Sequence, residues 1–207
     1  IAITAMSEEL LSSTIRDISD ITGYAPNVVI GSEGRRPGGT DIQIRGISAA
    51  ATTDNSYDSP IAINVDGIYL GTSAGSLLDN FDMERIEILR GPQGTLFGKN
   101  TVGGVVNVIR TRPTGEFGAK VQATFGEDGR QEFRTVINTS LSETVAAKFF
   151  ATSVQSDGWI PNKTIGGNNG EEDYKAFGAT FLFTPNEKFE ALLTIETMDD
   201  QSALQAY

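Results

Sequence analysis

The second half of the chain alternates apolar and polar residues with a period of two, and this pattern limits the possible folds more than any other. Phe117, Ala119, Val121, Ala123 and Phe125 are separated by Gly, Lys, Gln and Thr. A period of two places successive side chains on opposite faces of a β-strand. The first predicted strand is therefore 117–125. The same alternation predicts four more strands, at 132–141, 145–155, 174–183 and 188–197.

Two kinds of fold use such strands, and the alternation alone does not separate them. A soluble β-sandwich alternates in the same way, whereas segments of about ten residues also match tilted transmembrane β-strands. The connections 142–144 and 184–188 are tight, and 156–173 is long, polar and contains Trp159, the only Trp. Outer-membrane barrels have short periplasmic turns and longer outer loops. We therefore expect an antiparallel meander of barrel strands, with 156–173 outside the cell.

Five strands do not close a barrel, because the smallest such barrels have eight. Open edges in lipid would leave backbone donors and acceptors unpaired, at a cost of several kcal/mol each. The sequence therefore predicts a partial barrel, which forms the N-terminal part of a longer polypeptide.

The first half, 1–113, predicts a compact α+β domain instead. A short strand is expected at 1–5, and apolar residues at near-helical spacing predict an amphipathic helix, or two short ones, within 8–20. Four further strands are expected in one mixed sheet, with Arg112–Gly115 as the linker to the second half. These strands are 41–46, 60–65, 84–90 and 105–110.

Composition excludes several classes of function. The net charge is −11, with 27 acidic and 16 basic residues, so a nucleic-acid partner is not expected. The chain contains no His and no Cys, the residues that most zinc sites and acid–base or thiol catalysts use. We therefore predict that the protein is not an enzyme and has no cofactor or metal.

Two motifs with catalytic counterparts fail on inspection. Gly98-Lys99 lacks the first Gly of a P-loop, where Gln93 stands, and its hydroxyl residue, where Asn100 stands. The segment 71–75 matches the G-x-S-x-G nucleophile elbow, but no His is present as general base. A turn of small residues is the simpler interpretation of 71–75, and phosphate binding is not expected at Gly98-Lys99.

A family resemblance is carried by about thirty residues in order and spacing. The sequence runs ERIEILRGP over 84–92, then Leu96-Phe97-Gly98, then GGVVNVI over 103–109. These residues resemble the end of the plug domain of TonB-dependent outer-membrane receptors, with Phe97 where Tyr is more usual. Ile44-Arg45-Gly46 and the hairpin signal Asp66-Gly67 resemble two further motifs of that plug.

The resemblance implies a fold and a function. It implies a plug at 1–113 inside a 22-stranded barrel of the bacterial outer membrane, with the first five barrel strands in 114–207. It also implies import of a scarce ligand, such as a ferric siderophore, driven by the periplasmic TonB protein through a TonB box. That box normally precedes the first plug strand, which 1–4 resembles, so it is expected upstream of Ile1 and not in this sequence. A passive porin, or a surface binding or structural protein that keeps the fold without energised import, remains the alternative.

By resemblance, the ligand would meet three plug loops, 31–38, 47–59 and 71–76. Arg35 and Arg36 would suit an anionic ligand through charge-assisted hydrogen bonds. The expected ligand-binding residues are Arg35, Arg36, Asp54, Asn55, Tyr57 and Thr72.

Arg45 and Arg90 each end an apolar strand, where an unpaired charge is costly. In the resembling family, this pair of arginines faces glutamates of later barrel strands. We therefore predict that Arg45 and Arg90 lie close together, dock the plug, and lack a full set of carboxylate partners within 1–207. Local ion pairs with Glu84 or Glu87 are the alternative.

Overall fold

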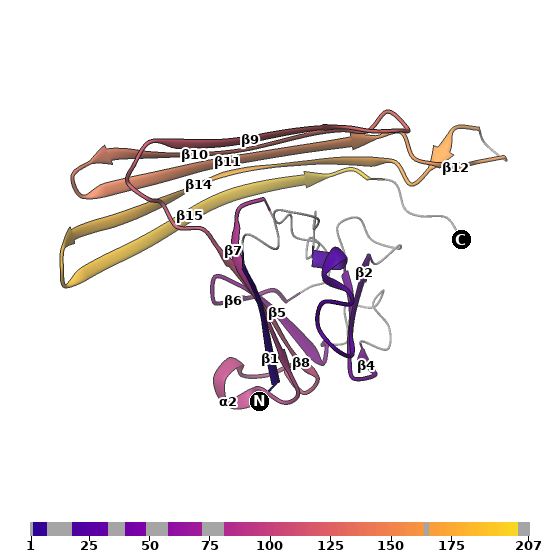
Figure 1. Ribbon diagram of the computed structural model, residues 1–207, viewed down its shortest axis with the longest axis horizontal. Helices are drawn as coiled ribbons and strands as arrows, with labels where there is room; N and C mark the ends of the chain where they lie inside the picture. Colours follow the sequence, from indigo (N-terminus) through magenta and orange to yellow (C-terminus); the bar gives the residue numbers. More distant parts are fainter. Residues whose placement is uncertain are drawn as a thin grey trace. The chain divides into compact units, whose positions relative to one another are not determined.

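The computed structural model describes residues 2–7, 18–32, 40–48, 58–71, 81–163 and 166–202. It divides into two compact units, Ile1–Thr111 and Arg112–Tyr207, whose strands are labelled in Figure 1. The predicted helix at 8–20 lies mostly outside the described residues, and its end is part of the 3-10 helix η1 (Ile18–Ile21).

The first unit is built on a five-stranded mixed sheet. β5 and β8 are parallel, with Ile61 opposite Gly104, and the other neighbours are antiparallel. The predicted strands at 1–5, 60–65, 84–90 and 105–110 are confirmed. In spatial order the strands are β1 (Ala2–Ser7), β7 (Met83–Arg90), β8 (Gly104–Arg110), β5 (Ile61–Val65) and β6 (Ile68–Tyr69).

One prediction about this sheet is wrong, because the strand at 41–46 belongs to a second sheet. There β3 (Thr40–Ile44) pairs with β2 (Val28–Ser32) and β4 (Ile47–Ser48). Both Arg45 and Gly46 have positive φ, so the chain turns after Ile44 and returns as β4. The Arg45 N–H donates to Asn27 O at 2.9 Å, which fixes the turn to the start of β2.

The core of the first unit lies on one face of the mixed sheet. Ile86, Ile88, Val106 and Val108 are fully buried there, which fits their alternation along β7 and β8. They join one cluster with apolar residues of η1, β2 and β3. A smaller cluster, Ala62, Leu89 and Val105, lies apart from it, and these residues alternate with the core residues along their strands. Both faces of the sheet are therefore apolar near Gly104.

The glycine-rich segment between β7 and β8 is a closed loop around the short helix α2 (Gly94–Phe97). The Gly91 N–H donates to Gly103 O at 3.0 Å, and Thr101 Oγ1 donates to Gly98 O at 2.8 Å. Gly104 has φ +152°, and a Cβ there would collide with the carbonyl oxygen of Leu89. Only glycine therefore allows β8 to begin this close to β7.

The second unit is an antiparallel meander, as predicted. The turns at 143–144 and 187–188 are tight, and the long connection 157–171 contains a two-stranded hairpin of β12 (Ile160–Pro161) and β13 (Asn168–Asn169). Each long strand pairs with its neighbours in the meander. These strands are β9 (Gly118–Phe125), β10 (Gln131–Ser142), β11 (Val145–Ser156), β14 (Glu172–Asn186) and β15 (Phe189–Asp200).

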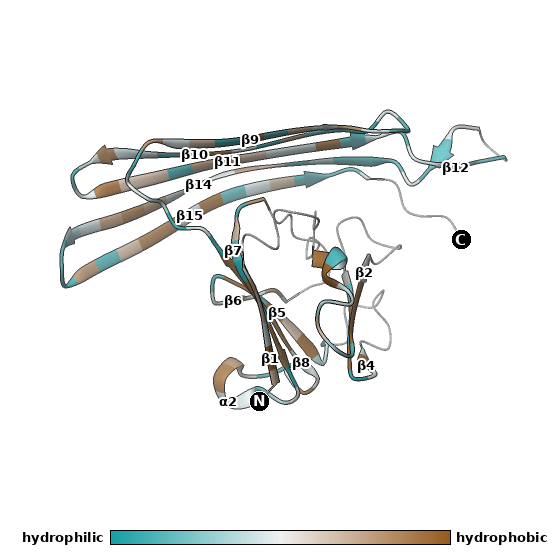
Figure 2. Cartoon of the chain, viewed as in Figure 1, coloured by the Kyte–Doolittle hydropathy of each residue, from teal (hydrophilic) through white to brown (hydrophobic). Residues whose placement is uncertain are grey.

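The two faces of this meander differ in polarity, and large side chains of the apolar face are exposed. Figure 2 shows brown and teal residues alternating along its strands. The opposite face buries charged or polar side chains, among them Glu132, Arg134, Lys148 and Thr180. Within this unit, no second sheet of long strands packs on the apolar face among the described residues, so the sandwich interpretation is not supported. The large exposed residues of that face include Val121, Phe125, Phe133, Ile137, Phe149, Phe177, Leu193 and Ile195.

Within the described part of the chain, no helix combines the length and the apolar character needed to cross a membrane.

Candidate functional site

The ligand-binding residues predicted from sequence fall in segments that the structure does not describe. They therefore stay predictions. These residues are Arg35, Arg36, Asp54, Asn55, Tyr57 and Thr72.

Arg90, at the end of β7, lies against β1 and the segment that precedes β2. Its Nη2 donates to Thr4 Oγ1 at 3.2 Å, and its Nη1 donates to Pro26 O at 3.1 Å. Its Nε is buried and has no hydrogen-bond partner. Arginine stays protonated in proteins, so this end of β7 holds a fixed positive charge whose hydrogen-bonding capacity is only partly used.

Arg45 brings a second guanidinium to the same end of β7. Its Nη1 lies 3.7 Å from the position that a Cβ of Gly91 would occupy, directly after Arg90. Among the described residues, neither arginine forms an ion pair with a carboxylate. Glu84 and Glu87, the local partners considered above, both pair with Arg85 instead. That the two guanidiniums lie close together and pair with carboxylates of other strands stays a prediction.

A second polar group crosses the mixed sheet on β7 and β8. Glu87 accepts hydrogen bonds from Arg85 Nε at 2.8 Å and from Asn107 Nδ2 at 2.9 Å. The bond from Arg85, and then the bond from Asn107, hold the pKa of the Glu87 carboxyl below its ordinary value. Asn107 stands opposite Asn64 of β5, whose Oδ1 is buried without a hydrogen-bond partner. The row therefore ends in an acceptor that is still available.

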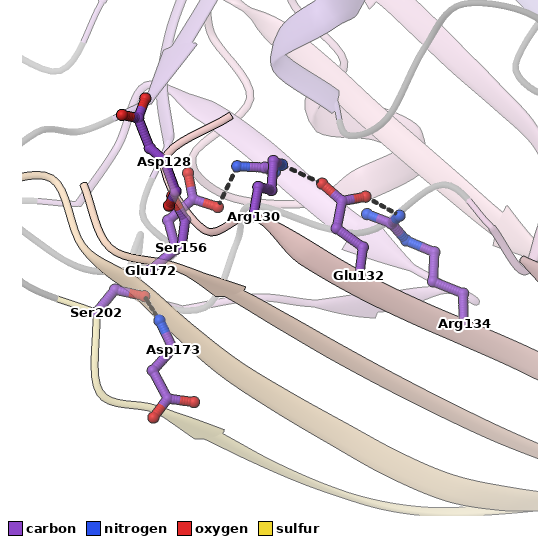
Figure 3. Close-up of polar contacts among 8 residues, drawn as sticks. All are labelled: Asp128, Arg130, Glu132, Arg134, Ser156, Glu172, Asp173 and Ser202. Atoms are coloured by element: carbon purple, nitrogen blue, oxygen red, sulfur yellow. Dashed lines mark hydrogen bonds and ion pairs between the residues drawn. The ribbon is translucent and has the colours of Figure 1, made fainter. Parts of the chain in front are cut away.

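The meander carries a row of ion pairs, which we call the polar-face ion row. Arg130 and Arg134 each donate to a different oxygen of Glu132, whose side chain is only 1 % exposed. Arg130 Nη1 also reaches Glu172 Oε2 of β14 at 2.9 Å, across β11. Figure 3 shows this row, together with Asp173 N–H donating to Ser202 Oγ at 3.2 Å. Paired ions of this kind tolerate burial because each charge has a partner.

Sequence reasoning missed this row, although a signal was present. Arg130, Glu132 and Arg134 alternate with Gln131 and Phe133, so three charges of alternating sign share one face of a strand.

The described residues offer no metal centre, since no group of three or more Asp or Glu side chains is arranged to hold an ion among them.

Comparisons with known proteins agree with this architecture. A family model described as "TonB-dependent Receptor Plug Domain" matches residues 1–105. The ferrichrome outer membrane transporter/phage receptor of Escherichia coli is 25 % identical over 182 residues, which cover 88 % of this chain and 23 % of that protein. The vitamin B12 transporter of Vibrio vulnificus is 23 % identical over 197 residues, covering 93 % of this chain and 31 % of its own length.

Solved structures show the same fold. The crystal structure of the ferric yersiniabactin uptake receptor from Yersinia pestis matches with a TM-score of 0.85 at 20 % sequence identity. The match covers 96 % of this chain and 31 % of that receptor. The chain therefore spans about a quarter to a third of the length of these relatives.

A plug followed by antiparallel strands with an exposed apolar face defines the class as a plugged outer-membrane β-barrel. The chain belongs to the TonB-dependent outer-membrane receptors, and its location is the outer membrane of Gram-negative bacteria. The named relatives are receptors and transporters, not enzymes, as expected from the composition.

Proposed function

We propose that the protein is an energised importer, in which a plug formed by 1–113 gates a barrel whose first five strands lie in 114–207. A scarce ligand, a ferric siderophore or a similar molecule, binds from outside the cell. The periplasmic TonB protein then pulls on a segment upstream of Ile1 and rearranges the plug.

The observation that carries this proposal is the polarity of the meander, found in the same chain as a plug. Val121, Phe133 and Phe177 expose an apolar face, while Glu132 and Arg134 are buried on the opposite face. Hydrocarbon suits the first face, and a polar interior suits the second. The relatives add the ligand class, because their names include ferrichrome, ferric yersiniabactin and vitamin B12.

In this proposal, the plug loops that face outward contact the ligand. Arg35 and Arg36 supply positive charge to an anionic chelate. The contacting residues would be Arg35, Arg36, Asp54, Asn55, Tyr57 and Thr72.

Arg45 and Arg90 would dock the plug on the barrel wall through carboxylates of strands beyond Tyr207. The support is geometric: Arg45 Nη1 lies beside Gly91, the residue that follows Arg90, and Arg90 Nε is buried without a hydrogen-bond partner. Arg90→Leu in the full-length receptor should therefore raise passive permeability while leaving ligand affinity comparable. Entry of a large antibiotic into cells measures passive permeability, and ligand titration on purified receptor measures affinity.

The control Arg90→Lys keeps the charge but not the hydrogen bonds to both Thr4 and Pro26, so it should raise passive permeability less than Arg90→Leu does. Lost affinity with unchanged permeability would place Arg90 in the ligand site instead.

Uptake measurements test the proposal as a whole. The full-length gene is introduced into a strain that lacks it, and uptake by these cells is measured. The probes are ⁵⁵Fe-labelled ferrichrome, ⁵⁵Fe-labelled yersiniabactin and radiolabelled cobalamin. We expect accumulation of at least one probe, and its loss when TonB is deleted or the proton gradient is collapsed. Accumulation that survives both treatments would identify a passive porin, and binding without accumulation would identify a surface binding protein.

A further inference from the structure

β11 and β14 are neighbours in the meander that are joined by a long connection rather than by a tight turn. The turns at 143–144 and 187–188 close the β10–β11 and β14–β15 hairpins, and a short turn sets the register of its two strands. The connection 157–171 between β11 and β14 is long enough to permit other registers. The two strands nevertheless pair in one register, with Phe150 opposite Gly178. Side chains must therefore select this register.

The alternation of the strands does not distinguish all registers. A shift by one residue would turn the apolar side chains onto the polar face, but a shift by two residues keeps every side chain on its face. On the apolar face, Phe149 lies opposite Ala179. A shift by two residues would bring Phe149 opposite Phe177 or Phe181, so this face stays apolar and accepts the slip.

The polar face does distinguish these registers, because the Phe150 ring lies there against Gly178. A Cβ at Gly178 would lie 2.5 Å from Cζ of the ring and 2.9 Å from Cβ of Glu196 on β15. The end of the ring therefore occupies space that any other residue at 178 would fill. Gly178 is not among the glycines with positive φ, so the position requires the missing side chain and not an unusual backbone conformation.

A slip by two residues would remove this fit. It would bring Phe150 opposite Ala176 or Thr180, and each of these carries a Cβ at the place that is empty in Gly178. A ring forced against such a Cβ must shift or push the strands apart, and overpacking of this kind destabilises a fold. Gly178 is the single glycine of β14, so one register alone gives the ring a gap.

We propose that Phe150 and Gly178 form a register lock, in which a ring on β11 fits a gap in β14 only when the two strands pair as they do here. The lock acts when the hairpin of β14 and β15 joins β11 during folding. A slip by two residues would displace β14 by about 7 Å along β11, and it would separate Glu172 from Arg130, which it contacts across β11. The inference goes beyond the proposed import function, since it concerns how the meander is assembled and not what the receptor carries.

Disulfide cross-linking of the full-length receptor measures the register. Residues 1–207 contain no Cys, so two cysteines are introduced into a receptor that carries no others, and the protein is folded from urea into lipid vesicles. The native pair, Ala151→Cys with Phe177→Cys, joins residues that are opposite in this structure. The slipped pair, Ala151→Cys with Lys175→Cys, joins residues that become opposite after a slip by two. Cysteines whose Cα atoms are more than about 7 Å apart do not form a disulfide, and diagonal neighbours lie about 7–8 Å apart, so each pair reports one register.

Moving the gap should move the register. The exchange variant Ala176→Gly/Gly178→Ala keeps the composition but places the glycine two residues earlier, so the ring fits when Phe150 lies opposite position 176. We expect cross-linking of the slipped pair to rise at least about threefold and cross-linking of the native pair to fall. Gly118→Ala is the matched control, because Gly118 also lies on the polar face and a Cβ there would meet nothing within 4 Å. It should change neither cross-link.

Phe150→Ala removes the ring and leaves the glycine in place. It should raise cross-linking of the slipped pair relative to the native pair, whereas the loss of a ring that merely fills space would lower the urea midpoint without changing this ratio. A ratio unchanged from wild type would overturn the inference, whatever the midpoint, and so would an exchange variant that keeps the wild-type ratio. If the exchange variant does not fold, the ratio in Phe150→Ala decides the question alone.

Discussion

The mixed sheet of the first unit and the meander of the second use the same alternation with opposite results. In the mixed sheet, Ile86 and Ile88 are completely buried. In the meander, Phe133 and Phe177 are exposed, whereas Glu132 is buried in ion pairs. A period of two therefore separates two faces of a strand, but the surrounding medium decides which face turns inward. Water drives the apolar face of the first sheet inward, and hydrocarbon removes that driving force from the second.

The largest test of this contrast removes apolar volume from the buried side. Ile88→Ala should destabilise the first unit by about 2–5 kcal/mol, because it leaves a cavity beside Ile86 and Val106. Ile3→Ala is the control, since Ile3 is exposed on β1, and it should cost less than about 1 kcal/mol. Hydrogen exchange of β7 and β8 amides in the full-length receptor measures the destabilisation in both variants. Equal loss of protection in the two variants would contradict the assignment of the core.

The next test places the same charge at two neighbouring positions on opposite faces of β9. Val121→Arg places a charge on the apolar face, and Gln122→Arg places the same charge on the polar face; both wild-type residues are exposed. The first change should cost about 2–4 kcal/mol if the position lies near the bilayer midplane, and the second less than about 1 kcal/mol. Urea titration of the receptor folded into lipid vesicles measures the unfolding free energy of each variant. A larger cost for Gln122→Arg would reverse the two faces.

The smallest effect concerns Glu87 of the mixed sheet, which accepts hydrogen bonds from Arg85 and Asn107. Glu87→Gln removes the charge that Arg85 stabilises, and it should cost less than about 1 kcal/mol at neutral pH, since the pair is partly exposed. Because the folded-state pKa of Glu87 is lowered, its contribution is complete above its ordinary value of 4.5 and disappears as the pH falls through the lowered pKa.

The urea midpoint for unfolding of the first unit, measured between pH 7 and pH 3, should therefore converge for wild type and Glu87→Gln in acid. A constant gap over that range would show that hydrogen bonding, and not charge, separates the two proteins.

The strand pairings that the sequence predicted well are those between strands adjacent in the chain. The meander from 117 to 197 is of this kind, because each hairpin follows directly from the strand before it. The prediction that the strand at 41–46 belongs to the mixed sheet was wrong for the opposite reason. Alternation identifies a strand, but Arg45 and Gly46, at positive φ, redirect the chain into a separate sheet, and no local pattern fixes which strands pair.

The site shows the same limit. The positions of Arg45 and Arg90 at strand ends are visible in the sequence, and so is the exposed loop around Trp159. The bonds from Arg90 to Thr4 and Pro26 are not, because they join residues from three distant parts of the chain. The alternating charges of Arg130, Glu132 and Arg134 are visible in the sequence, but the burial of Glu132 is not.

The pairing of β1 with β7 also governs the order in which the protein assembles after secretion. Ala2 lies opposite Arg90, so β1 has no partner in the mixed sheet until β7 has followed it. Closing so long a loop is slow compared with forming adjacent hairpins. During that interval β1 is an unprotected strand edge, which is a surface prone to aggregation. A periplasmic chaperone that binds extended apolar segments should therefore engage 2–7 before any other strand of the sheet.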